Sequence, residues 1–189
     1  MIDTNEMVAT LADVVSRLDE LGIRYMVTGS FAMSIYATAR TTMDIDIIVE
    51  IGSTKADRFE AKFSPDYYVS AASVRRAEQH CSMFNMLSNL TGVKVDCILR
   101  KRDKLESEKF DRRRRATLGA IEFWVIAKND LILSKLRWAK DSHSELQFRD
   151  IRNLVESGVD ERVILDQVKS ERLQEVWKAF EKWKTRIAK

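Results

Sequence analysis

The sequence is poor in the residues that build flexible linkers and covalent crosslinks. Its 189 residues include one proline, six glycines and two cysteines. With so little proline and glycine, no stretch has the composition of a flexible linker, so any boundary between units must fall between packed elements. Cys81 and Cys97 stand among apolar residues of expected strands, and we expect both to be reduced core thiols of a cytoplasmic protein.

Long apolar runs and a strong excess of one charge are also missing. No run approaches the roughly 20 apolar residues that span a bilayer. The first twenty residues carry five acidic side chains, which argues against a signal peptide. The net charge is +3, too small to predict nucleic-acid binding by itself. Residues 101–115 are locally basic, and this run indicates either a contact with a polyanion or a solvated helix end. The sequence therefore predicts a cytoplasmic protein that is not bound to a membrane.

Hydrophobic periodicity divides the chain into a mixed first part and a helical second part. The spacing predicts helices at 5–21, 31–37, 55–63, 70–79 and 103–113. It predicts strands at 25–27, 44–49, 82–87, 92–99 and 118–126. Four more helices follow, at 129–140, 145–156, 161–168 and 171–187. We therefore expect an α/β (α+β) fold, with a mixed sheet flanked by helices in residues 1–127 and a helical region in 128–189 packed on it. Core positions are expected for all four tryptophans: Trp124, Trp138, Trp177 and Trp183.

Asp44 and Asp46 are two acids on one face of an apolar strand. Residues i and i+2 of a strand point to the same side, so these carboxylates lie together while Ile45 and Ile47 face the core. Like charges beside apolar residues repel each other and are costly to bury. A divalent cation removes that cost, and carboxylate oxygens favour Mg²⁺ or Mn²⁺. Without other signals, such a pair would more often be two exposed aspartates on a solvated sheet.

Gly29 and Ser30 stand between a short apolar strand and an expected helix. Glycine lets a phosphate approach the backbone, and a helix N-terminus offers free N–H groups and the positive end of a dipole. Ser30 can cap this helix and also donate to a phosphate. Alone, the two residues indicate only a turn and a cap. Thirteen residues separate Ser30 from Asp44, however, so a phosphate cradle and a metal platform are expected near each other.

Asp96 is an acid in the middle of the apolar strand expected at 92–99. It shares a face with Lys94 and Ile98, whereas the opposite face is entirely apolar. A third ligand to the metal would explain this carboxylate, and Asp96 is predicted as a catalytic residue. An ion pair with Lys94 or with a neighbouring arginine explains it equally well from the sequence alone.

Three short motifs together resemble the catalytic signature of the polymerase-beta-type nucleotidyltransferase superfamily. They are Thr28-Gly29-Ser30, Asp44-Ile45-Asp46 and Val95-Asp96-Cys97. The resemblance covers about residues 20–155. It implies a mixed-sheet nucleotidyltransferase core in which Asp44, Asp46 and Asp96 bind Mg²⁺ or Mn²⁺ and carry catalysis. It also implies a nucleoside triphosphate as substrate, held by Gly29 and Ser30.

Two further segments resemble the AbiE-type toxin branch of that superfamily. The first is Arg40-Thr41-Thr42-Met43-Asp44-Ile45-Asp46. The second is Asp130-Leu131-Ile132-Leu133-Ser134-Lys135-Leu136, followed by Arg149-Asp150-Ile151. The branch has a lysine motif and a later aspartate on its C-terminal helices. The resemblance therefore implies that Lys135 and Asp150 belong to the nucleotide-binding site.

Three candidate nucleotide contacts also have alternative roles. Lys135 falls inside the apolar face of its helix, where an ammonium needs a partner such as a triphosphate, unless it extends along its neighbours to the solvent. Asp150 is placed to hold Lys135, to contact the nucleotide or acceptor, or to form a structural salt bridge. The guanidinium of Arg40 matches phosphate geometry, and a surface role is equally plausible.

The resemblance leaves the acceptor open. It implies a toxin component that modifies RNA, such as the 3′ end of tRNA, or a protein hydroxyl, with an antitoxin as partner. Transfer to a small molecule, as in antibiotic-modifying members of the superfamily, is an alternative. A catalytically silent nucleotide-binding module is another, although the complete set of carboxylates argues against it.

Overall fold

The chain forms two compact units. This computed structural model describes residues 4–38, 42–142 and 144–187, so Arg40 lies outside the described residues. The first unit takes in Met1–Ala32 and Arg40–Ile126, and the second takes in Met33–Ala39 and Ala127–Lys189. In the described ranges, no helix combines the length and the apolar character that crossing a membrane requires.

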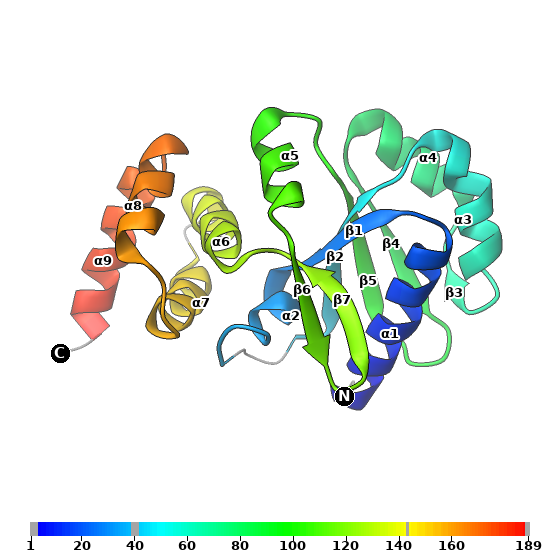
Figure 1. The fold of residues 1–189 in the computed structure, drawn as a ribbon, viewed down its shortest axis with the longest axis horizontal. Helices are drawn as coiled ribbons and strands as arrows, with labels where there is room; N and C mark the ends of the chain where they lie inside the picture. Colours follow the sequence, from blue (N-terminus) through cyan, green and yellow to red (C-terminus); the bar gives the residue numbers. More distant parts are fainter. Residues whose placement is uncertain (1–3, 39–41, 143, 188–189) are drawn as a thin grey trace. The chain divides into compact units, whose positions relative to one another are not determined.

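The first unit is built on a seven-stranded sheet with the strand order β3-β4-β5-β2-β1-β7-β6 (Figure 1). Its strands are β1 (Arg24–Thr28), β2 (Asp44–Glu50), β3 (Tyr67–Tyr68), β4 (Met83–Ser88), β5 (Lys94–Leu99), β6 (Arg114–Leu118) and β7 (Ile121–Val125). The pairs β2–β5 and β1–β7 are parallel, and the other neighbouring pairs are antiparallel. This mixed sheet with its flanking helices confirms the predicted fold class.

Helices cover one face of the central strands. The helices of this unit are α1 (Thr4–Glu20), α2 (Gly29–Met33), α3 (Ala56–Phe63), α4 (Ala71–His80) and α5 (Lys104–Asp111), with a 3-10 turn η1 (Ser53–Lys55). Helix α1 packs on β1 and β2, α4 packs on β4, and α3 packs on α4. Strand β2 alternates accordingly, with Ile45, Ile47 and Val49 fully buried and its other residues half-buried. The half-buried face of β2 carries both of its aspartates.

The single strand predicted at 118–126 is instead part of a longer two-stranded segment that begins at Arg114. This segment is a hairpin of β6 and β7 that turns at Gly119, where φ is +60°. Arg114 and Arg115 are exposed on the edge strand β6 and are therefore not part of a solvated helix end. Arg115 stands opposite Trp124 in the hairpin, with its guanidinium carbon 5.2 Å from the ring centroid. This cross-strand pair stabilises the hairpin, and periodicity alone did not reveal it.

The second unit consists mainly of four helices, as predicted. They are α6 (Lys128–Ser142), α7 (Glu145–Glu156), α8 (Glu161–Ser170) and α9 (Gln174–Ile187). Helix α9 begins three residues later than predicted because the backbone turns at Arg172, where φ is +57°. Phe148 joins α7 to α9, with its ring centroid 5.9 Å from that of Phe180 and 5.8 Å from that of Trp183. Asn153 donates a hydrogen bond to the carbonyl of Thr38 at 3.2 Å, which ties the segment after α2 to these helices.

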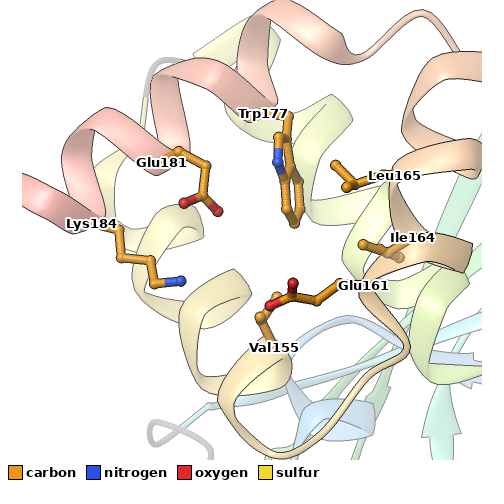
Figure 2. A pocket seen from close by; sticks show the side chains of 7 residues that line it. All are labelled: Val155, Glu161, Ile164, Leu165, Trp177, Glu181 and Lys184. Atoms are coloured by element: carbon orange, nitrogen blue, oxygen red, sulfur yellow. The ribbon is translucent and has the colours of Figure 1, made fainter.

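A small pocket opens among α7, α8 and α9 (Figure 2). Its volume is about 190 Å³, and its lining includes Glu161, Trp177, Glu181 and Lys184. Ligand sites usually span about 300–1,000 Å³. None of the predicted site residues lines this pocket, and we assign it no function.

Two predicted core positions are wrong. Cys97 is fully buried, but Cys81 is exposed because it ends α4 in a left-handed conformation with φ of 45°. Both thiols are free. Trp138 is 66% exposed although it follows Leu131 by two helical turns. Burial on that side of α6 does not continue to its C-terminal turns.

Candidate active site

The register of β2 and β5 brings the three predicted catalytic acids together. Asp46 and Asp96 are direct partners across this parallel pair, and Asp44 is opposite Lys94. Neighbouring strands lie about 5 Å apart, and directly paired residues point to the same sheet face. The three aspartates therefore share one face of two adjacent strands. Asp46 and Asp96 are far apart along the chain, and they meet because β2 and β5 are neighbours in the sheet.

Thr42 orients the carboxylate of Asp44. Its hydroxyl donates a hydrogen bond of 2.7 Å to Asp44 Oδ1. Asp44 is the first residue of β2 and is half-buried, so it lies at the open end of the strand. No role for Thr42 was predicted from the sequence. The sequence does contain a signal for this hydrogen bond. A threonine two residues before an aspartate can donate from its hydroxyl to the aspartate side chain.

Gly29 lies directly against the carboxylate of Asp46. Thr28, the last residue of β1, is the register partner of Asp46, so Gly29 follows where this pairing ends. The φ of Gly29 is +65°, and a Cβ built on it would stand 1.9 Å from Asp46 Oδ2. Glycine is therefore needed here for the backbone conformation and for the space that Asp46 occupies. From the sequence, Gly29 was predicted only as a phosphate contact.

The helix after β1 is shorter than predicted and begins earlier. It starts at Gly29 and ends at Met33, whereas the sequence predicted residues 31–37 with Ser30 as the cap. Ser30 is the second helical residue and is buried. A single turn contributes little dipole, so a phosphate bound here would depend on individual backbone N–H groups. Gly29 and Ser30 remain predicted nucleotide contacts on that basis.

Lys94 forms an ion pair with Asp96. Asp96 is 6% exposed, and its Oδ2 lies 2.9 Å from the ammonium of Lys94. The hydrogen bond with Asp96 raises the pKa of Lys94 above its ordinary value, and the charges of Asp44 and Asp46 add to this. The alternative explanation of Asp96, an ion pair with Lys94, is thus present in the structure. It does not satisfy the whole carboxylate, because Oδ1 is buried and has no hydrogen-bond partner among the described residues.

The three aspartates have the right chemistry for a divalent cation, but their side chains are not arranged as a complete coordination site. Within residues 4–38, 42–142 and 144–187, no group of three or more His, Cys, Asp or Glu side chains is arranged to hold a metal ion. Metal binding therefore remains a prediction. The partnerless Oδ1 of Asp96 is unusual for a buried carboxylate and leaves an acceptor for an added cation or donor. Adjacent carboxylate oxygens are the ligands that Mg²⁺ and Mn²⁺ prefer.

Lys135 and Asp150 form a buried ion pair in the second unit. The ammonium of Lys135 lies 2.7 Å from Asp150 Oδ2, and the two residues are 5% and 2% exposed. Of the roles open to Asp150, the structure thus shows that it holds Lys135, which joins α6 to α7. Contact of either residue with a nucleotide remains a prediction.

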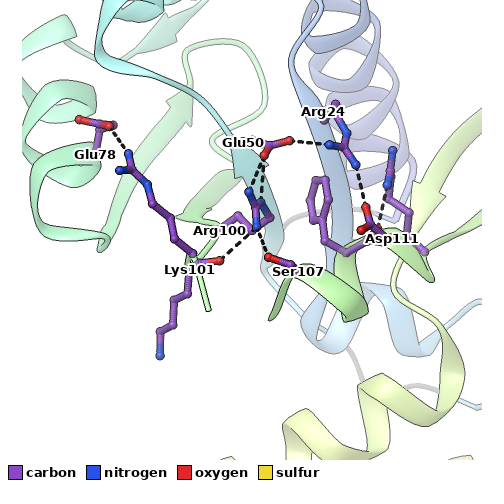
Figure 3. Close-up of polar contacts among 10 residues, drawn as sticks. Arg24, Glu50, Glu78, Arg100, Lys101, Ser107 and Asp111 are labelled. Atoms are coloured by element: carbon purple, nitrogen blue, oxygen red, sulfur yellow. Dashed lines mark hydrogen bonds and ion pairs between the residues drawn. The ribbon is translucent and has the colours of Figure 1, made fainter. Parts of the chain in front are cut away.

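An ion-pair network closes the other end of the central strands (Figure 3). Arg24 of β1 pairs with Glu50 of β2 at 3.0 Å and with Asp111 of α5 at 2.9 Å. Arg100, which follows β5, pairs with the same Glu50 at 2.6 Å and donates a hydrogen bond of 2.7 Å to Ser107 of α5. The network fixes α5 to the sheet at the end opposite Asp44.

Comparisons with known proteins identify the fold. No protein-family model and no curated protein matches the chain. An antigenic nucleotidyltransferase-like protein from Paracoccidioides brasiliensis superposes with a TM-score of 0.70 at 15% identity, covering 99% of this chain and 92% of that one. A putative nucleotidyltransferase from Thermotoga maritima gives 0.55 at 16% identity, covering 77% and 92%. A lincosamide antibiotic adenylyltransferase bound to lincomycin gives 0.53 at 14% identity, covering 83% and 99%. The chain therefore has a nucleotidyltransferase-like fold.

Proposed function

We propose that this chain is a metal-dependent nucleotidyltransferase that moves a nucleoside monophosphate from a nucleoside triphosphate to a hydroxyl acceptor. The observation that supports this most is the pairing of Asp46 with Asp96 across β2 and β5, with Gly29 against Asp46. These residues occur in a fold that the chain shares with nucleotidyltransferases. Structural similarity at 14–16% sequence identity supports the fold alone. The proposed activity rests on the three aspartates.

In this proposal the protein positions the reactants and balances their charge. Asp44, Asp46 and Asp96 would hold Mg²⁺ or Mn²⁺, which neutralises phosphate charge during the displacement. Gly29 and Ser30 hold the triphosphate. The acceptor oxygen forms a bond to the α-phosphorus, the bond to pyrophosphate breaks, and Asp96 takes the hydroxyl proton.

Arg40, Lys135 and Asp150 complete the proposed nucleotide contacts. Lys135 steadies the departing pyrophosphate, and Asp150 keeps its ammonium in place through their ion pair of 2.7 Å. Arg40 contributes a guanidinium, whose planar donors match phosphate oxygens.

The resemblance to the AbiE-type branch suggests a cytoplasmic toxin whose acceptor is tRNA or a protein, with an antitoxin as partner. The likeness to a lincosamide adenylyltransferase favours a second candidate, transfer to a small molecule. Growth arrest when the protein is expressed would favour the toxin. Nucleotide binding without turnover in either Mg²⁺ or Mn²⁺ would instead favour a silent regulatory module.

The proposal is tested by incubating the protein with each labelled triphosphate, Mg²⁺ or Mn²⁺, and total cell extract. We expect a labelled product with one or more triphosphates, and a decrease of at least ~10²-fold in Asp46→Asn, because a ligand to the cation is lost. Asp57→Asn is the matched control, since Asp57 is exposed and pairs with Arg75 on the surface. Full activity in a folded Asp46→Asn variant would refute the assignment.

A further inference from the structure

The sheet face that carries the aspartates continues into a cavity. Its volume is about 340 Å³, and its lining includes Ile48, Ile98, Ser82, Met83, Lys101 and Cys81. This volume falls within the range of about 300–1,000 Å³ that is typical of small-molecule sites. The first unit alone provides the whole lining.

Strand register places this cavity next to the acids. Ile48 and Ile98 follow Asp46 and Asp96 by two residues on the same face and are themselves register partners. Met83 of β4 is opposite Ile98, which extends this apolar floor to a third strand. Two residues of a strand span roughly 6.6 Å. Asp96 does not itself line the cavity, so an acceptor on this floor must extend its hydroxyl along β5 by about this distance to meet the carboxylate.

The lining has an apolar floor and a charged rim. Met83 is 46% exposed and, with Ile48 and Ile98, offers a surface for an apolar body. In Figure 3 the side chain of Lys101 points away from the ion-pair network, and no described carboxylate pairs with it. Lys101 thus supplies an exposed ammonium beside an apolar floor. Arg100 and Glu106 also line the rim, where Arg100 pairs with Glu50 and Glu106 pairs with Lys109. Because the ammonium of Lys101 has no such counter-charge among the described residues, the cavity suits an anionic group on a molecule with an apolar body.

We propose that this cavity binds the acceptor, a small molecule with a hydroxyl group, an apolar body and an acidic group. The hydroxyl is directed to Asp96, the apolar body lies on Ile48, Ile98 and Met83, and the acidic group meets Lys101. The inference rests on the proposed function and specifies its acceptor. The acceptor oxygen bonds to the α-phosphorus, pyrophosphate leaves with the electron pair of the broken bond, and the proton passes to Asp96.

Binding to the cavity can be measured without catalysis by using 4-hydroxyphenylacetate as the probe. In protein with ¹³C-labelled isoleucine and methionine methyl groups, we expect saturable shifts at Ile48, Ile98 and Met83. Lys101→Gln should weaken binding about tenfold, because one charge pair of roughly 1.4 kcal/mol is lost. Lys104→Gln is the control, since Lys104 is an exposed lysine on nearby α5. The absence of shifts at these methyl groups at millimolar concentration would overturn the proposal.

Cys81 gives a way to block the cavity in the transfer assay. It lines the cavity and is exposed, whereas Cys97 is buried and burial raises the pKa of its thiol. N-ethylmaleimide should therefore react with Cys81 and not with Cys97. We expect it to raise the KM for the acceptor in the natural protein and to have no effect on Cys81→Ser.

The extract assay separates failure of this inference from failure of the proposed function. A labelled small product that decreases after N-ethylmaleimide treatment, with Cys81→Ser resistant, supports both. Label in an RNA or protein band that the treatment leaves unchanged overturns the small-molecule acceptor and keeps the transferase. The absence of transfer from every triphosphate overturns the transferase itself.

Discussion

At the scale of single residues, the absence of a side chain at Gly29 is as important as the carboxylate beside it. The positive φ of Gly29 and the approach of Asp46 Oδ2 both exclude a Cβ at this position. Lys94 acts in the same small region by pairing with Asp96. The geometry of the acids thus depends on Gly29 and Lys94, neither of which is a proposed metal ligand.

Gly29→Ala should reduce both stability and transfer activity. The left-handed backbone costs about 1–2 kcal/mol for a residue with a Cβ, and the new methyl group displaces Asp46. Gly119→Ala is a matched control, because φ is +60° there and a Cβ would meet nothing within 4 Å. Urea unfolding should show a loss in both variants that is larger in Gly29→Ala, because only there does the new methyl group collide with a side chain. Transfer should decrease about 10²-fold only in Gly29→Ala. Equal activity in the two variants would contradict this account of Gly29.

At the scale of secondary-structure elements, spacing predicted the long helices and the central strands but not their order. The alternation in β2 was enough to place Asp44 and Asp46 on one face. It carried no information on which strand lies beside β2, and hence none on the pairing of Asp46 with Asp96. The hairpin of β6 and β7 was missed because two arginines begin an edge strand, where solvent exposure permits charge.

The buried pair of Lys135 and Asp150 should be a strong link between α6 and α7. Asp150→Ala leaves the ammonium of Lys135 buried without its carboxylate, and we expect a loss of about 3–5 kcal/mol in the free energy of unfolding. The double variant Lys135→Met with Asp150→Leu should be more stable than Asp150→Ala, because it also removes the buried ammonium. Removing the exposed pair of Lys178 and Glu175 should cause no measurable change. A similar stability for Asp150→Ala and the natural protein in urea unfolding would refute this role.

At the scale of the whole molecule, the sequence predicted the fold class and much less of the site. The resemblance in three motifs led to a fold that the structure confirms. It did not reveal the collision that excludes a side chain at Gly29, the hydrogen bond from Thr42 or the cavity beyond Asp96. Each of these depends on contacts between segments that only the folded chain brings together.

The central claim is that carboxylates from β2 and β5 share a divalent cation beside Gly29. It is tested most directly by anomalous diffraction at the manganese edge, from crystals grown with Mn²⁺ and a non-hydrolysable triphosphate analogue. We predict a manganese peak about 2.1 Å from oxygens of Asp46 and at least one of Asp44 and Asp96. A bound nucleotide with its manganese elsewhere, and no peak at these aspartates, would contradict the account.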